Sequence, residues 1–170
     1  LAPGVLLDDE PVPLFPALTS AVLRWGDADA ARELLDEHPE PALALLLPPA
    51  TRDAFLADAI HNTAPKQFPD LCHRLQQQDE LRLGPGAAGA VLDGIRACVK
   101  AKSGVHQAAT QLLAFSTDPR DIPELLPRIT ALNRDPDIPQ PGRRAVRDAV
   151  AALTLRQSIH ESIAHTKEPR

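Results

Sequence analysis

Apolar residues recur along most of the chain at intervals of three and four positions, which places them on one face of an α-helix. Proline separates these runs. Because helices accept proline in the first turn and rarely later, each proline marks the start or the end of an element. The pattern predicts helices over 14–22, 30–37, 40–47, 51–62, 67–75, 90–95, 105–115, 121–129, 145–150 and 158–165.

The apolar stripe changes phase near the end of the chain. The first stripe consists of Val146, Val150 and Leu153, and the second consists of Leu155, Ile159 and Ile163. Since a straight helix keeps one stripe on one face, the change predicts a bend or a break near residues 154–158.

Three short segments share a pattern of apolar residue, proline, any residue and leucine, with another apolar residue four positions later. They follow one another at offsets of 53 and 54 residues and read LFPALTSAV (14–22), QFPDLCHRL (67–75) and DIPELLPRI (121–129). Farther along, AVLDGI at 90–95 matches AVRDAV at 145–150. The offsets predict about three units of three helices, which must stack to bury their apolar stripes.

This arrangement resembles the helical-repeat proteins of the HEAT and armadillo kind, although its period is longer than theirs. The resemblance implies a right-handed α-solenoid, and a compact helical bundle is the structural alternative. The expected organisation is an N-terminal arm, a single helical domain of three units and a short tail, at residues 1–13, 14–166 (units of about 14–66, 67–120 and 121–166) and 167–170.

Composition also favours an all-α fold. The 170 residues include 27 Ala and 25 Leu, whereas Val, Ile and Thr together number 23. Ala and Leu favour helices, and β-branched residues favour strands. No apolar run approaches the ~20 residues of a membrane span, and no signal-peptide pattern is present. We therefore expect a cytoplasmic protein without membrane contact, and the excess of arginine over lysine suggests a bacterial source.

Gly84, Gly86 and Gly89 spell G-x-G-x-x-G, the glycine pattern of dinucleotide-binding folds. That function requires a strand before the loop and an acidic residue ~20 positions beyond it. Only the three residues LRL, too few for a strand, separate Gly84 from the polar stretch QQQDE, and the stretch at 109–115 contains no acid. The pattern therefore predicts a turn that begins a helix, and we expect no cofactor.

Cys72, His73, Cys98 and His106 are zinc-ligand types, but their spacing forms no C-x-x-C or H-x-x-x-H pair. Adjacent residues on a helix point about 100° apart. We therefore expect no metal site, and we expect the two cysteines to be buried, reduced thiols.

Asp58 and His61 lie three positions apart on a predicted helix and are candidates for an acid–base pair in a pocket. A surface ion pair near the helix C-terminus is the plainer interpretation. No nucleophile, metalloprotease or phosphate-loop motif accompanies them, so we expect a protein that is not an enzyme.

Arg143, Arg144 and Arg147 lie in the opening turns of a predicted helix, where cations oppose the helix dipole. Such locally unfavourable choices occur at functional surfaces. These arginines are our candidates for binding an anion or a carboxylate-bearing partner. Alternatively, Arg144 pairs with Asp148 on an ordinary solvated face.

These features favour a non-enzymatic interaction module that binds a protein partner or another domain of a longer chain. The net charge is −5, with −8 in residues 1–85 and +3 in residues 86–170. This polarity also favours self-association. The alternatives are a nucleic-acid-binding domain that uses the basic half, which the overall acidity and the scarcity of aromatic residues disfavour, and a helical enzyme or small-ligand sensor.

Overall fold

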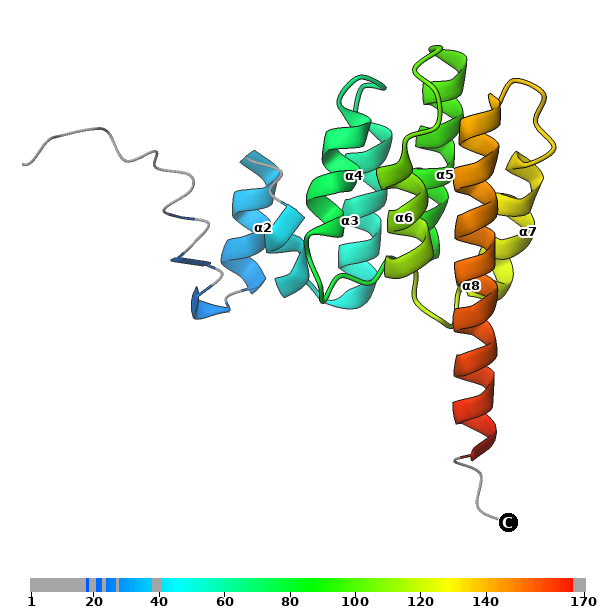
Figure 1. The fold of residues 1–170 in the computed structure, drawn as a ribbon. Coiled ribbons are helices and arrows are strands. Elements are labelled where there is room, and N and C mark those ends of the chain that lie inside the picture. The colour runs from blue at the N-terminus through cyan, green and yellow to red at the C-terminus, as the bar shows by residue number, and fades with distance from the viewer. Residues whose placement is uncertain (1–17, 19–20, 23, 27, 38–40, 167–170) are drawn as a thin grey trace, which may run out of the picture. The chain divides into compact units, whose positions relative to one another are not determined.

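The computed structural model describes residues 18, 21–22, 24–26, 28–37 and 41–166 (Figure 1). Within these ranges lie seven α-helices and one 3-10 helix, and no strand longer than the isolated bridge between Leu83 and Thr117. The all-α prediction is confirmed. The predicted arm at 1–13, the tail at 167–170 and most of the first predicted helix lie outside the described residues.

The chain divides into two compact units, residues 1–47 and 48–170. This boundary falls inside the first predicted repeat, 14–66. In the first unit, α2 (Ala28–Glu37) packs against the 3-10 helix η1 (Pro41–Leu46). Ala31 and Leu43 are fully buried there, whereas Trp25 exposes 79% of its surface.

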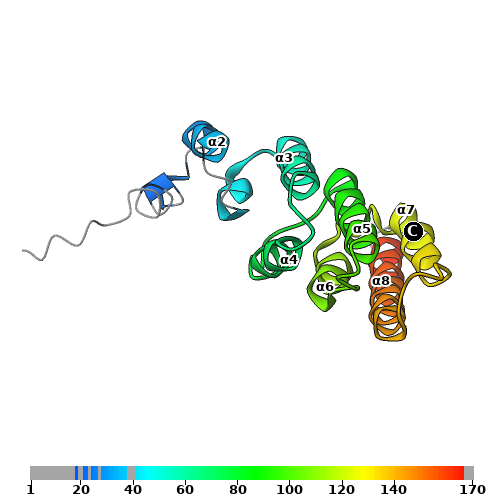
Figure 2. The ribbon, with the colours of Figure 1, turned by 90° about the horizontal axis from the view of Figure 1, so that it is seen from above.

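The second unit consists of helices that alternate between two layers (Figure 2). In one layer α3 packs against α5 and α5 against α7, and in the other α4 packs against α6 and α6 against α8. The helices are α3 (Pro49–His61), α4 (Phe68–Gln76), α5 (Pro85–Lys100), α6 (Gln107–Ser116), α7 (Ile122–Leu132) and α8 (Gln140–Thr166).

The alternation of layers corrects the predicted period of three helices. The second and third copies of the proline pattern lie on α4 and α7, which belong to different layers. Since three is an odd number, a shift of three helices moves every helix into the opposite layer and gives it different neighbours. The matching segments share only a way of beginning a helix, with proline in the first turn of both α4 and α7.

The centre of the second unit is α5, half of whose sixteen residues are buried. The buried residues at 87–90 are alanine or glycine, which lets α3 and α7 approach closely. Farther along α5, a side chain at Gly94 would collide with the ring of Phe68 on α4. Glycine and alanine therefore set the distance between α5 and its neighbours.

The glycine-rich stretch begins α5 at Pro85, as the sequence predicted, and the anion at this helix end is a side chain of the protein. Asp53 of α3 accepts hydrogen bonds from the backbone N–H groups of Gly86 (2.9 Å) and Ala87 (2.8 Å). A Cβ atom at Gly84 would lie 2.6 Å from this carboxylate, and one at Gly86 2.8 Å. The glycines thus give Asp53 access to the positive end of the helix.

The predicted break near residues 154–158 is wrong, because α8 runs without interruption from Gln140 to Thr166. The helix leaves its neighbours and continues as one element. Val146, Ala149 and Leu153 are buried where α8 packs against α6 and α7, whereas the residues after Gln157 are exposed. Figure 1 shows this half of α8 projecting past α6 and α7. None of the described helices is both long enough and apolar enough to span a bilayer.

Replacement of Asp53 by alanine should lower the free energy of unfolding by about 1–2 kcal/mol, because two N–H groups at the start of α5 lose a charged acceptor. Urea denaturation measures the change. Asp58→Ala on the same helix is the matched control, since Asp58 is exposed, and it should leave stability nearly unchanged. Equal losses in the two variants would refute the capping role of Asp53.

Candidate interaction groove between α6 and α8

A groove of about 490 Å³ lies between α6 and α8. Its walls are mainly apolar, and Phe115 at its edge exposes 59% of its surface. The lining residues are Val105, Gln107, Thr110, Gln111, Ala114 and Phe115 on one side and Pro141, Arg144, Ala145, Asp148, Ala149 and Ala152 on the other. An exposed aromatic side chain beside apolar walls is typical of a protein-binding site.

The α8 wall of this groove continues as an apolar face beyond it. The groove residues Ala145, Asp148 and Ala152 are three or four positions apart. The same spacing continues in the exposed residues Leu155, Ile159 and Ile163. Residues at this spacing share one face of a helix. The face is therefore walled by α6 in its first half and open in its second half.

Arg156 fastens α8 to the end of α6 where the walled half of the face becomes the open half. Its guanidinium donates to the backbone carbonyls of Ala114 (2.7 Å) and Thr117 (2.8 Å), which end α6. Burial lowers the pKa of Arg156, and the nearby charge of Arg82 lowers it further. These bonds satisfy carbonyls that a helix C-terminus leaves unpaired.

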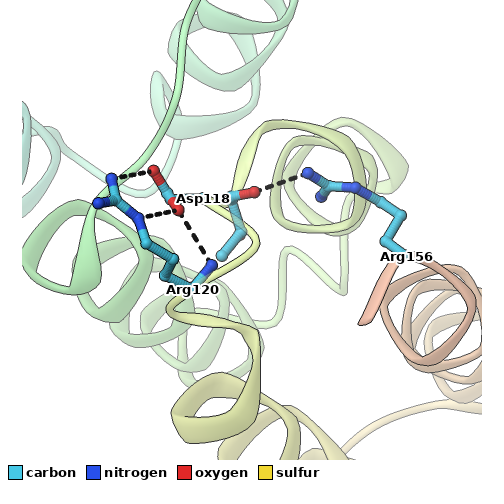
Figure 3. Close-up of polar contacts among 4 residues, drawn as sticks. Asp118, Arg120 and Arg156 are labelled. Carbon is cyan, nitrogen blue, oxygen red and sulfur yellow. Dashed lines mark hydrogen bonds and ion pairs between the residues drawn. The ribbon is translucent and has the colours of Figure 1, made fainter. Parts of the chain in front are cut away.

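Next to this contact, Asp118 holds the start of the connection to α7 (Figure 3). Arg120 donates to the Asp118 carboxylate through Nε (3.1 Å), a terminal nitrogen (3.0 Å) and its backbone N–H (3.0 Å). The hydrogen bond from the Arg120 side chain holds the pKa of Asp118 below its usual value. Because Arg120 is exposed and its acceptor is local, this pair shapes the turn.

The three arginines that we predicted to bind an anion or a partner line two different pockets. Arg144 lines the groove beside Asp148, but no ion pair joins these two side chains among the described contacts. Arg143 and Arg147 line a separate pocket of about 590 Å³ at the turn between α7 and α8. Arg143 also donates to the backbone carbonyl of Ile138 at 3.0 Å. The structure therefore divides the three arginines between two pockets.

Asp58 and His61, the predicted acid–base candidates, form no ion pair with each other among the described contacts. The His61 ring instead faces Asp93 of α5, with Nε2 3.6 Å from a carboxylate oxygen. Asp93 also accepts a hydrogen bond from Arg96 at 3.0 Å. Since the His61 and Asp93 side chains are about half exposed (54% and 50%), this is a surface cluster.

Cys72 and Cys98 are both free thiols buried in the second unit. Burial, with a smaller contribution from Cys98, raises the pKa of the Cys72 thiol from 9.0 to about 12. Burial also raises the pKa of Cys98. The described residues contain no group of three or more His, Cys, Asp or Glu side chains that could hold a metal ion.

Sequence reasoning missed the α6 side of the groove and a neighbouring polar hollow. Phe115 lies outside the buried face of α6. An aromatic residue at such a position was the one sequence signal that could have indicated a binding surface on α6. The hollow, of about 440 Å³, lies between α4 and α6 and is lined by His73, Gln76, Gln77, Gln107, Ala108 and Gln111. Gln76 donates across it to Gln111 at 3.1 Å.

Residues 5–163 of the chain match a family of unknown function, DUF5691, and the protein belongs to this family. No curated protein and no solved structure matches the chain. Hypotheses about its activity therefore depend on the surfaces of the molecule itself.

Replacement of Arg156 by alanine should destabilise the second unit by about 1–2 kcal/mol, because two helix-end carbonyls lose a charged donor. Hydrogen exchange should show the largest increase in amide exchange in residues 153–166. Arg120→Ala is the matched control, and it should change stability little because Arg120 is exposed. If both variants behave like the wild type, Arg156 does not anchor α8.

Proposed function

We propose that the protein is a non-enzymatic interaction module that binds an amphipathic helix of a partner protein, or of another domain of a longer chain. The binding site is the groove between α6 and α8. The observation that carries this proposal is the apolar groove of about 490 Å³ with a 59%-exposed phenylalanine at its edge. Grooves between packed helices accept the apolar face of an additional helix.

The polar groups of the groove specify the occupant further. Arg144 and Asp148 lie one helical turn apart on its α8 wall and make no ion pair with each other among the described contacts. A partner helix that offers a carboxylate to Arg144 and a cation to Asp148 complements both charges. Its apolar residues would lie against Phe115 and Ala152. The occupant we propose is therefore apolar on one face and carries both signs of charge at the rim.

The arrangement of the arginines favours a protein over a nucleic acid as the partner. A surface that grips phosphates needs several cations on one face. Here Arg144 lies in the groove, whereas Arg143 and Arg147 line the pocket beside α7. We assign to Arg147 a secondary contact with acidic residues that flank the partner helix.

For the architecture, we propose a short solenoid of three helical hairpins, α3–α4, α5–α6 and α7–α8. The proposal is supported by the way each layer is extended by every second helix. In this arrangement α4, α6 and α8 form a continuous outer layer, and both the groove and the glutamine-lined hollow open on it. The period is two helices, in contrast to the three of the sequence pattern.

A displayed library of amphipathic helical peptides, randomised at apolar positions i, i+3, i+4 and i+7, tests the binding proposal. We expect selection on the wild-type protein to enrich peptides whose binding is lost with Ala152→Arg, because the new side chain fills the groove. Fluorescence anisotropy with one enriched peptide should show a Kd at least about tenfold weaker, the size of one hot-spot substitution.

Ala131→Arg is the matched control, because Ala131 is exposed on α7 in the other layer. It should bind the enriched peptide as the wild type does. Selection that enriches no helix, or peptides whose binding is insensitive to Ala152→Arg, would overturn the groove as the binding site. Tight binding of generic DNA that weakens steeply with salt would support the nucleic-acid alternative instead.

A further inference from the structure

The projecting half of α8 carries a row of large apolar side chains that no part of the described structure covers. Leu155, Ile159 and Ile163 expose 62%, 51% and 52% of their surfaces and follow one another at four-residue spacing. Such a row forms a nearly straight ridge on a helix. Its exposure costs solvation free energy in an isolated chain, and packing against another apolar surface would recover it.

A row of small hydroxyl side chains runs beside this ridge. The hydroxyls of Thr154, Ser158, Ser162 and Thr166 each donate to the backbone carbonyl four residues earlier, at 2.8–3.1 Å. Because these hydroxyls already have acceptors, they need no water or partner group. A second helix can therefore approach α8 closely along this edge without leaving donors unsatisfied.

The charges of this half of α8 lie away from the ridge. Arg156 is turned inward to the carbonyls at the end of α6. Glu161 accepts a hydrogen bond from Gln157 at 2.8 Å, and helical spacing places both on the side of α8 opposite Ile159. Although the whole chain carries a net charge of −5, two copies can bring their ridges together without placing like charges in contact.

We propose that the occupant of this ridge is the same ridge of a second copy of the chain, so that two α8 helices pair in an antiparallel arrangement. A two-fold axis near Ile159 places Leu155 of one copy opposite Ile163 of the other. The antiparallel direction places the two sets of packed helices at opposite ends of the pair, whereas a parallel pair would bring the two Phe115 edges together. It also aligns the helix dipoles favourably.

The ridge residues lie beyond the groove lining, but a two-fold axis near Ile159 also places Thr166 of the second copy opposite Ala152 at the end of the groove. The pairing therefore adjoins the proposed binding site without using its central residues. The paired ridge segments, residues 155–163, are about 14 Å long. A contact of this size is small for a protein interface, so the dimer should dissociate on dilution.

Sedimentation velocity over two decades of protein concentration tests the proposal. The wild-type chain should shift from monomer to dimer, and Ile159→Lys should weaken dimerisation by at least about tenfold because it places a charge at the centre of the contact. Gln157→Lys makes the same charge change on the opposite side of α8 and should dimerise as the wild type does. Circular dichroism checks that all three chains remain helical.

Disulfide cross-linking tests the direction of pairing. A mixture of Leu155→Cys and Ile163→Cys chains should form mixed disulfides faster than either chain cross-links with itself, because the antiparallel pair places these two positions opposite each other. The native cysteines are buried and should not take part. A wild-type chain that stays monomeric, or a dimer that tolerates Ile159→Lys, overturns the proposal. Faster self-linking of Leu155→Cys overturns the antiparallel arrangement. Peptide binding measured on the Ile159→Lys chain separates the two proposals, because this variant loses the pairing but keeps every residue of the groove lining.

Discussion

Two helices that pack side by side, α6 and α8, differ greatly in length, and this difference determines which part of α8 is exposed. α6 has 10 residues and α8 has 27, or about 15 Å against about 40 Å of helix. The first half of α8 buries Val146, Ala149 and Leu153, and the second half has no neighbour in the described structure. The exposed ridge follows from this excess length, whereas the groove lies where the two helices run side by side.

Arg156 stabilises α8 at the point where its packing against α6 ends. Helix ends leave carbonyls without partners, and a helix that leaves its neighbour tends to fray at that point. By binding the carbonyls of Ala114 and Thr117, the Arg156 side chain closes the end of α6 and holds α8 in place. The same contact marks the boundary between the groove and the exposed ridge on α8.

The G-x-G-x-x-G pattern illustrates how one physical requirement serves different ends. A helix N-terminus attracts an anion, and close approach requires residues without side chains. In dinucleotide-binding folds the anion is a pyrophosphate, whereas here it is the carboxylate of Asp53. The glycines at 84 and 86 are therefore explained by a contact within the protein, between α3 and α5.

The sequence predicted the helices well because their apolar periodicity and proline starts are local properties. α3, α4, α6 and α7 lie close to their predicted ranges. Layer membership depends on contacts between distant segments, so a chance match of proline-leucine motifs on α4 and α7 suggested a period of three helices. The change of stripe at Leu155 was real, but periodicity alone could not distinguish a broken helix from a straight helix that leaves its neighbour.

Sequence analysis identified only part of the candidate site. Arg144 proved to line the groove, whereas Arg143 and Arg147 face another pocket. Three residues within two helical turns point in different directions, and which of them shares a pocket depends on the neighbouring helices. Phe115 escaped notice because an isolated aromatic residue on a helix usually belongs to the core.

The openness of the α8 face is tested most directly by NMR of isoleucine methyl groups in the presence of a soluble paramagnetic agent. In dilute protein, the methyls of Ile159 and Ile163 should relax strongly, whereas that of the fully buried Ile129 should not. At high protein concentration, Ile159 and Ile163 should become protected. If they are as protected as Ile129 at the lowest concentration, another part of the chain already covers this face, and it is not an interaction surface.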